Sequence, residues 1–360
     1  MTIVINGRFL NQPVTGVQRY GRAFLEHLDA MPDKWGHHTF SVICPKLSRS
    51  QPQLRNIEIV QRGKLKSHLW EQLELPCYLD GSLLLCFANT APVLSLFSGK
   101  RIVTVVHSLA YACFPESYSP IFRATYSVIT PLIMRYSSVV ITVSETEKKS
   151  ILRRYPNVEK RLFVVPNGGL PYHIAPKETS PCAGPYILYV GTFNKLKNFP
   201  AVLKVAERIL TKHRDFFFVF IGDTGAIYNE AIFRRDEKLS TRMLFPGQID
   251  DFGLMAQYYK HATALVFPSQ SESSGLPPIE AMSFGCPVIV SDIPALRERC
   301  GDAAIYCEPC VHDIFEKTDI VIRDHNLRVD LAERGLQHAT QFTWDNCVLN
   351  TLNILHSIDG

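Results

Sequence analysis

Short runs of β-branched and other apolar residues alternate with longer amphipathic stretches along the whole 360-residue chain. Many of the short runs are apolar throughout, which is typical of strands buried on both faces of a parallel sheet. Seven strands are expected in the first half: TIVING, HTFSVICP, IEIVQ, SLLLCFA, RIVTVVH, SVVITVS and RLFVVPN. Six more are expected in the second half: YILYVGT, FFFVFIGD, RMLFPGQ, ATALVFPS, CPVIVSD and AAIYCEP. Helical patterns separate many of them, for example at residues 16–30, 200–213 and 251–261.

This alternation predicts an α/β protein with two doubly wound, Rossmann-like domains, and the length of the chain suits two domains. Residues 171–185, PYHIAPKETSPCAGP, contain four prolines and no clear periodicity, so they are predicted to form a linker. The domains are then residues 1–170 and 186–340. Residues 341–360 are expected to be a C-terminal helix, for which packing back on the first domain is one option.

Open α/β sheets bind ligands outside the carboxyl ends of their strands. Two such sheets joined by a linker would place their ligand sites face to face across a cleft. That layout suits a two-substrate enzyme, and it also suits a two-lobed binding protein.

The ten cysteines have no repeating spacing, which favours reduced thiols in a cytoplasmic enzyme over a disulfide framework. The opening residues MTIVINGRFL enter a strand-like run and do not resemble a signal peptide. The longest apolar runs are far too short to span a membrane. We therefore expect a cytoplasmic protein that could at most lie on a membrane surface.

Charge is distributed unevenly between the halves. Residues 1–170 carry 20 Lys and Arg against 11 Asp and Glu, which gives +9, whereas residues 171–360 carry 18 against 23, which gives −5. Six basic residues lie between positions 148 and 161: Lys148, Lys149, Arg153, Arg154, Lys160 and Arg161. This run is either a solvated helix face or a site of attraction to anionic lipid. Nucleic acid is not expected as a partner, because no aromatic platform is interleaved with the basic residues.

A strand, a glycine, two lysines and a helix start follow one another in YILYVGTFNKLKN, with Gly191, Lys195 and Lys197. Backbone N–H groups and a cationic side chain converge in such a segment, which makes it a candidate phosphate cradle. The alternative is a surface turn with two solvated lysines.

Two glutamates flank the start of a short helix in SESSGLPPIEAMSFGCPVIVSD, and seven residues separate Glu272 from Glu280. Pro277 and Pro278 suit the first turn of a helix, where a missing N–H costs nothing. Carboxylates accept hydrogen bonds from hydroxyl groups, so the pair could hold two polyhydroxylated groups. Alternatively, both are helix N-terminal charges favoured by the dipole, which suits Glu280 better than Glu272.

The same stretch resembles the E-x7-E signature of the family 4 retaining glycosyltransferases, which have the GT-B fold. The resemblance extends in order over nearly the whole chain, through TGVQRYGRAFLEHL, VVHSLAYACFPESY, ITVSETEKKSIL, FVVPNGG, YVGTFNKLKNFPAVLKVAERI and GDAAIYCEP. The branch it is most similar to is the bacterial mannosyltransferase-like branch that builds surface polysaccharides.

The resemblance implies a role for each matching residue. Glu280 would bind the ribose hydroxyls of the nucleotide, Glu272 the hydroxyls of the donor sugar, and Lys197 the leaving diphosphate. His107 would lie near the C6 side of the sugar or near the acceptor, unless it is a core histidine. The catalytic set is thus Glu272, His107 and Lys197. The donor-binding residues implied are Gly16, Gly191, Thr192, Lys195, Lys197, Glu272, Ser274, Gly275, Leu276 and Glu280.

The sequence departs from the family pattern at several of these positions. Thr192 stands where family members often have Arg, and Arg19 or Lys195 could compensate for the missing charge. Ser108 follows His107 where Asp is common. ESSG replaces the commoner Glu-Gly-Phe-Gly around the sugar.

The resemblance implies transfer of a hexose from a nucleotide sugar, with GDP-mannose the first candidate, to a saccharide or lipid-linked acceptor in capsule, O-antigen or exopolysaccharide synthesis. Retention of configuration is expected, and no metal or other cofactor is expected, because lysine and helix N-terminal dipoles can meet the charge of the leaving group.

Two other functions compete with this one. A nucleotide-sugar epimerase of the same fold would need further acid and base groups, for which the first half offers His107 and Glu116. A non-catalytic sugar-binding scaffold subunit is the other. Cys300, Cys307 and Cys310, with His312 nearby, have a spacing that can bind zinc or act in redox chemistry. Residues 117–138 form an aromatic stretch that suits a core-packing helix or a membrane surface.

Overall fold

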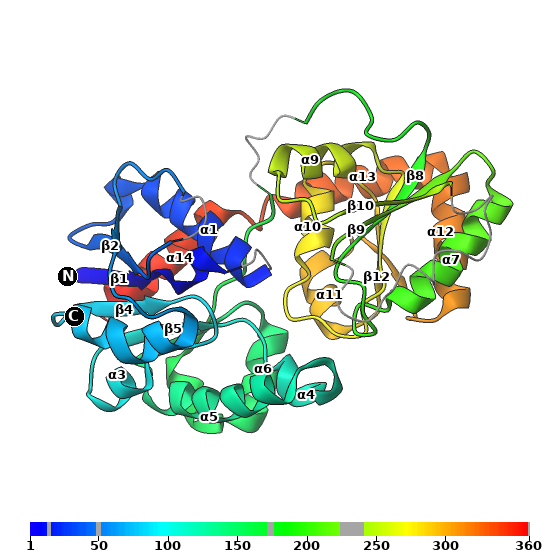
Figure 1. Cartoon of the computed structure of the whole chain (residues 1–360). Coiled ribbons are helices and arrows are strands. Elements are labelled where there is room, and N and C mark those ends of the chain that lie inside the picture. Colours follow the sequence, from blue (N-terminus) through cyan, green and yellow to red (C-terminus); the bar gives the residue numbers. More distant parts are fainter. Residues whose placement is uncertain (13–15, 48–51, 171–175, 224–240, 359–360) are drawn as a thin grey trace. The chain divides into compact units, whose positions relative to one another are not determined.

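The computed structural model describes residues 1–12, 16–47, 52–170, 176–223 and 241–358. By internal contacts, the chain divides into two compact units (Figure 1). Unit 1 comprises Met1–Asn167 and Trp344–Gly360, and unit 2 comprises Gly168–Thr343. Each unit has a parallel sheet with helices on both faces, so the predicted fold class is confirmed.

The sheet of unit 1 has the strand order β3-β2-β1-β4-β5-β6-β7, and every pairing in it is parallel. All seven apolar runs predicted in the first half form its strands: β1 (Thr2–Asn6), β2 (Thr39–Cys44), β3 (Glu58–Gln61), β4 (Leu83–Cys86), β5 (Ile102–Val106), β6 (Val139–Thr142) and β7 (Leu162–Val164).

The sheet of unit 2 has the order β10-β9-β8-β11-β12-β13, again with parallel pairings. The six runs predicted in the second half form its strands: β8 (Tyr186–Val190), β9 (Phe217–Ile221), β10 (Met243–Gly247), β11 (Ala264–Phe267), β12 (Val288–Ser291) and β13 (Ile305–Cys307).

Helices connect the strands. In unit 1 they are α1 (Gly16–Asp29), α2 (Ser67–Leu69), α3 (Val93–Phe97), α4 (Ala110–Cys113), α5 (Pro120–Tyr136), α6 (Glu145–Arg154) and α14 (Trp344–Ser357). In unit 2 they are α7 (Phe199–Lys212), α9 (Phe252–His261), α10 (Leu276–Met282), α11 (Pro294–Cys300), α12 (Val311–Arg323) and α13 (His325–Ala339). Short 3-10 segments are η1 (Gly7–Asn11), η2 (Pro32–Lys34), η4 (Leu75–Tyr78), η5 (Pro115–Ser117) and η6 (Pro156–Arg161), and η3 (Trp70–Glu74) is a π-helix.

Alternating side chains of each strand supply two apolar cores, one on each face of the sheet. In β1, Ile3 and Ile5 join one core while Val4 joins the other. In β8, Leu188 and Tyr189 likewise point to opposite faces. Because both faces are covered, the runs can be apolar at every position, which is the pattern that the sequence shows.

The C-terminal helix α14 belongs to unit 1, where it packs against α1 (Figure 1). Trp344 and Tyr20 make an edge-to-face contact with ring centroids 5.4 Å apart. The boundary between the units falls after Asn167. Of the predicted linker, residues 171–175 lie outside the described residues. Residues 176–185 hold neither helix nor strand and contact α9, whose Gln257 Nε2 donates to the carbonyl of Thr179.

All ten cysteines are free thiols, as the scattered spacing predicts. In the described ranges, no helix combines the length and the apolar composition that crossing a bilayer requires.

Candidate active site

The carboxyl ends of β8 and β11 are neighbours at the point where the strand order of unit 2 reverses. Open α/β sheets bind ligands at this switch point. The loop after β8 carries Gly191, Thr192, Lys195 and Lys197, and the loop after β11 carries Glu272. The fold therefore brings the predicted phosphate cradle and the first predicted carboxylate to adjacent strand ends.

A glycine at the end of β9 allows the loop after β8 to pass close to the β9 backbone. Gly222 has φ +151°, and a Cβ atom there would lie 2.1 Å from the carbonyl oxygen of Gly191. The N–H of Gly191 in turn donates to the carbonyl of Ile221 at 2.9 Å. Any side chain at position 222 would push these strand ends apart, so the predicted cradle depends on this glycine.

The loop enters α7 through a left-handed residue, Asn198, whose φ is +56°. Its side-chain amide donates to the carbonyl of Pro309 at 2.8 Å. Asn194 Oδ1 accepts from the backbone N–H of Lys197, also at 2.8 Å. These two bonds fix the backbone from which the Lys197 side chain projects.

Lys197 and Glu272 form an ion pair across the switch point. Lys197 Nζ donates to Glu272 Oε1 at 2.5 Å and lies 5.6 Å from the centre of the Phe267 ring. Both side chains are largely buried, which strengthens the attraction relative to an exposed pair. Thr192 and Lys195 are exposed on the same loop.

The second carboxylate lies deeper than the first. Glu280 is buried in α10, and Tyr259 of α9 donates its hydroxyl to Glu280 Oε2 at 2.8 Å. The sequence did not point to Tyr259. Its spacing from Met255 and Ala256 indicates a buried face of α9, but nothing in that pattern identifies Glu280 as its partner.

The start of α10 is shaped by Gly275, whose φ of +62° suits glycine. A Cβ atom there would lie 2.7 Å from Leu296 Cδ2, so a larger residue would displace the Leu296 side chain of α11. The neighbouring Ser274 hydroxyl is buried and has no hydrogen-bond partner among the described residues. A buried polar atom in that state lowers stability, and orphaned groups of this kind occur at ligand sites.

In unit 1, His107 follows β5 and its side chain is buried. Its Nε2 lies 2.7 Å from the carbonyl oxygen of Phe87, and its backbone N–H donates to Asn89 Oδ1 at 2.6 Å. Because a carbonyl only accepts, Nε2 carries the hydrogen and Nδ1 is left as the acceptor. Burial lowers the pKa of His107 to about 4, so the ring is neutral at physiological pH.

Two other predicted residues are exposed in unit 1. Gly16 is the first residue of α1 and is exposed, and Glu116 is exposed in η5. Cys300 and Cys307 are buried whereas Cys310 is exposed. Within the described ranges, no three His, Cys, Asp or Glu side chains are arranged to hold a metal ion.

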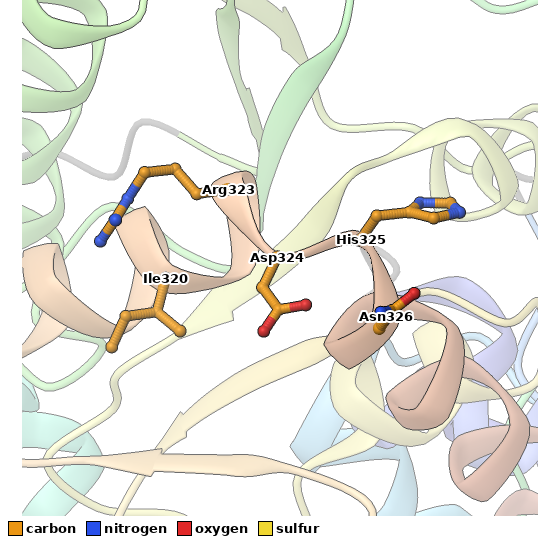
Figure 2. A pocket seen from close by; sticks show the side chains of 5 residues that line it. All are labelled: Ile320, Arg323, Asp324, His325 and Asn326. Atoms are coloured by element: carbon orange, nitrogen blue, oxygen red, sulfur yellow. The ribbon is translucent and has the colours of Figure 1, made fainter.

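A surface hollow occurs elsewhere in unit 2, where α12 ends and α13 begins (Figure 2). Its polar side chains diverge, and they are engaged locally: Arg323 pairs with Asp319, and Asp324 Oδ1 accepts from the N–H of Leu327. Because α12 starts after β13 and runs back along the sheet, this hollow lies at the edge opposite Lys197 and Glu272.

Two family models match the chain. The model described as Glycosyltransferase Family 4 matches residues 14–168, and the model described as Glycosyl transferases group 1 matches residues 174–338. Together they cover most of both units. The chain belongs to the family 4 glycosyltransferases.

Known proteins agree with this assignment. The transferase is 27% identical to the O-antigen chain mannosyltransferase B of Escherichia coli over 268 residues, 71% of this chain and 70% of that protein. It is 24% identical to the O-antigen chain mannosyltransferase RfbU of Salmonella typhimurium over 96% of each chain. Its fold is similar to that of sucrose-phosphate synthase from Thermosynechococcus elongatus, with a TM-score of 0.75, 20% identity and coverage of 99% and 98%. The predicted GT-B fold is thus confirmed.

The transferase also contains a buried ion network that the sequence did not indicate. Glu71 of the π-helix η3 is fully buried, and its Oε1 accepts from Arg8 Nε at 3.2 Å, Asn6 Nδ2 at 2.6 Å and Thr90 Oγ1 at 2.9 Å. Arg8 also donates to Thr90 Oγ1 at 2.8 Å. Burial alone would raise the pKa of Glu71, but the positive charge of Arg8 and the hydrogen bonds from His68 and Thr90 outweigh it and lower the pKa to about 2.

This network fixes the segment after β4, and that segment in turn binds His107. Thr90 lies in the segment after β4 whose Phe87 carbonyl and Asn89 side chain bind the ring and backbone of His107. Asn89 itself has a left-handed φ of +57°, a strained conformation that persists only where neighbours enforce it. Arg8 follows β1 and Thr90 follows β4, so the network occupies the switch point of unit 1.

Thr90→Val should therefore loosen the surroundings of His107. The valine keeps the volume but leaves Arg8 and Glu71 without their shared hydroxyl, at a cost of about 1 to 3 kcal/mol in the free energy of unfolding. Hydrogen exchange at the His107 backbone N–H should speed up by about tenfold or more through local opening.

The matched control is Thr104→Val on β5, which removes a buried hydroxyl that pairs with Ser137 instead. It should leave exchange at His107 limited by global unfolding. The same acceleration in both variants, after correction for their stabilities, would contradict a role of the network in holding His107.

His107 should also make stability depend on pH. Its pKa is about 4 in the folded chain and about 6.5 in the unfolded chain, so between these values only the unfolded chain binds the proton. The free energy of unfolding should fall as the pH drops from about 6.5 to about 4. His107→Gln should make that fall shallower in denaturant titrations at a series of pH values, and equal slopes would contradict the assignment.

Proposed function

We propose that this chain transfers a hexose from a nucleotide sugar to a saccharide or lipid-linked acceptor in the synthesis of a bacterial surface polysaccharide. The observation that carries the proposal is the Lys197–Glu272 ion pair at adjacent strand ends, with Glu280 buried beside it in the next helix. Cation and carboxylates are the groups that a diphosphate and sugar hydroxyls require.

The donor would reorganise this site when it binds. Its diphosphate would take Lys197 from Glu272, and Glu272 would turn to the sugar hydroxyls. Glu280 would accept from the ribose hydroxyls, with Tyr259 holding one carboxylate oxygen in place. The Ser274 hydroxyl and the N–H groups of Ser274, Gly275 and Leu276 would contribute donors at the start of α10. Gly191, Thr192 and Lys195 would border the diphosphate.

The chemistry proposed for the transfer is stabilisation of the leaving nucleoside diphosphate. Lys197 and the first N–H groups of α10 and α7 would meet the charge that develops on it, so a metal ion is not required. The acceptor hydroxyl would attack the anomeric carbon from the face that the diphosphate leaves, which gives retention of configuration. As the bond between that carbon and the phosphate oxygen breaks, the departing phosphate oxygen would take the proton of the acceptor hydroxyl. His107, neutral and with Nδ1 as its acceptor, would hold a hydroxyl group and would not act as a general acid.

The names of the relatives support mannose, with GDP-mannose as the first donor to test, and O-antigen as the first product class. The family assignment favours transfer over the epimerase and scaffold alternatives, and Lys197, Glu272 and His107 would be the catalytic set.

A membrane-bound acceptor would suit the positive charge of the N-terminal half. Of the six basic residues between positions 148 and 161, Lys149, Arg153, Arg154 and Lys160 are exposed. Arg161 is used within the fold, since its guanidinium donates to backbone carbonyls at the end of α5, including that of Met134 at 2.9 Å. We propose that the exposed four add reversible attraction to anionic lipid.

Glu280→Ala and Glu272→Ala should distinguish binding of the nucleotide from binding of the sugar. Glu280→Ala should weaken binding of the free nucleoside diphosphate by about 1.5 to 3 kcal/mol, because the ribose hydroxyls lose an acceptor. Glu272→Ala should leave the affinity for the free nucleoside diphosphate nearly unchanged and weaken only the binding of the nucleotide sugar. Calorimetry with both ligands measures this, and the exposed Glu207→Ala on α7 is the control. Equal losses of nucleoside diphosphate binding in both variants would overturn the two roles.

The donor itself can be found by thermal shift over nucleoside diphosphates and their sugars, since a ligand at a hundred times its Kd adds about 2.7 kcal/mol. The best ligand is then incubated with and without saccharide acceptors. Lys197→Ala should lower kcat far more than donor affinity. Turnover of the donor to an isomeric sugar without an acceptor would establish an epimerase, and binding without any turnover would establish a scaffold subunit.

A further inference from the structure

A buried carboxyl group lies beside the segment that carries His107. Glu147 is in the first turn of α6 and is only 7% exposed. His107 follows β5 and Glu147 follows β6, and these two strands pair in parallel, so both residues lie at the carboxyl edge of the sheet of unit 1. Glu147 Oε1 accepts a hydrogen bond from the backbone N–H of Leu109 at 2.8 Å.

Helix capping does not account for this carboxylate. Ser144 and Glu147 have the spacing of a capping box, in which each side chain binds the backbone N–H of the other residue. One half of this motif is formed, because Ser144 Oγ accepts from the N–H of Glu147 at 3.0 Å. The carboxylate of Glu147 instead crosses to the neighbouring connection, where it binds Leu109.

Three side chains hold the segment between β5 and α4 by accepting from its backbone N–H groups. Asn89 Oδ1 binds the N–H of position 107 at 2.6 Å, Glu147 Oε1 that of position 109 at 2.8 Å, and Ser108 Oγ that of position 110 at 3.0 Å. Leu109 is the N-cap residue of α4, and its apolar side chain cannot bind the N–H groups there. Of the three acceptors, only Glu147 has a charge that can be gained or lost.

Burial sets the protonation of this carboxyl group. Helix α6 packs against β6, β7 and η6. The titratable side chains of these elements and of the segment from position 107 to position 113 are His107, Tyr111, Cys113, Glu145, Lys148, Lys149, Arg153, Arg154, Tyr155, Glu159, Lys160 and Arg161. None of them contributes to the pKa of Glu147, which burial raises to about 7 against the opposing effect of the Leu109 N–H. Such a group gains and loses its proton at physiological pH.

The proton and the hydrogen bond oppose each other. The N–H of Leu109 favours the ionised carboxylate of Glu147. By linkage, ionisation strengthens the hydrogen bond by the same factor. A neutral carboxyl group accepts a weaker bond than a carboxylate does, so protonation of Glu147 loosens its hold on the segment.

We propose that Glu147 is a positioning residue for the transfer: its carboxylate fixes the segment between β5 and α4 and so places His107, and its protonated form releases that segment. The proposal rests on the proposed function of His107, whose Nδ1 would hold a hydroxyl group. It adds that unit 1 presents this atom in a fixed position only while Glu147 is ionised, so transfer slows on acidification.

The first test needs no substrate. The chain is labelled with 15N-leucine, and the N–H signal of Leu109, identified by its absence in Leu109→Met, is followed by NMR between about pH 5.5 and 8.5. The signal should shift with a midpoint of about 7. Its hydrogen exchange, corrected for the intrinsic effect of pH, should be about fivefold more protected at pH 8 than at pH 6. His107 cannot cause the shift, because its pKa is about 4.

Glu147→Gln keeps an oxygen that accepts from Leu109 but cannot be ionised, so the Leu109 signal of this variant should not titrate. It should fold at least as stably as the unchanged chain at pH 8, because it removes a buried charge. The matched control is Glu145→Gln, which removes an exposed carboxylate from the same turn of α6. In that control the Leu109 signal should titrate as it does in the unchanged chain.

The second test measures transfer with the nucleotide sugar and acceptor that support turnover. The ratio of the kcat of the unchanged chain to that of Glu147→Gln should rise by about fivefold between pH 6 and pH 8. Glu147→Leu should lower kcat at pH 8 by about tenfold or more, and Glu147→Gln should recover most of that loss. The KM for the donor should stay the same in both variants, because the donor would bind unit 2.

A Leu109 signal that does not titrate near pH 7, or that titrates equally in Glu147→Gln, would overturn the proposal. So would a ratio of kcat values that is the same at every pH, because Glu147 would then hold the segment without affecting transfer. Failure of the proposed function would appear differently, as an absence of turnover with every donor while the Leu109 signal still titrates.

Discussion

Parallel strand pairing is the constraint on which the structure depends. In a parallel sheet all carboxyl ends meet at one edge, and each return passes through a crossover that covers a face. Both units obey it, with reversals of strand order between β1 and β4 and between β8 and β11. Each reversal separates two loops that leave in opposite directions. Arg8 and Thr90 meet in one such gap, and Lys197 and Glu272 meet in the other.

The two gaps are filled differently. In unit 1 the two charged groups are buried: Glu71 and Arg8 bind one another and the side chain of Thr90, which suits a network that holds other residues in place. In unit 2 the side chains of Lys197 and Glu272 are partly exposed, so the charged group of each is accessible to a ligand. Burying an ion pair costs desolvation free energy but fixes the positions of both side chains. A partly exposed ion pair can instead exchange one partner for a ligand.

Much of the fold could be predicted from the sequence because strands covered on both faces are apolar at every position. All thirteen predicted runs form strands, and the predicted helices 200–213 and 251–261 begin and end within one residue of α7 and α9. Candidate site residues near strand ends were found for the same reason. The hydrogen-bond partners of these residues could not be predicted. Tyr259, for example, contacts Glu280 through side-chain geometry that no local sequence pattern indicates.

The network around Glu71 was missed for a related reason. A glutamate beside Trp70 in WEQLELP looks like the polar side of an amphipathic helix, and only the long-range contacts with Asn6, Arg8 and Thr90 make it a buried ion. The aromatic stretch 117–138 suits a core-packing helix or a membrane surface by its sequence. In the structure one stripe of α5 packs into the core, while Ile121 and Val128 are exposed.

Helix α14 has a consequence for the order in which the protein can be made. Unit 2 is continuous in sequence, but the core of unit 1 takes Trp344, Cys347, Val348, Leu352 and Leu355 from the last helix. On the ribosome, unit 1 would begin to form before unit 2 but be completed after it, with the apolar surface beside α1 uncovered until α14 emerges. A fragment ending near residue 170 would lack α14 and would stay incomplete. A variant in which a short connector links residue 360 to residue 1 would keep α14 with unit 1.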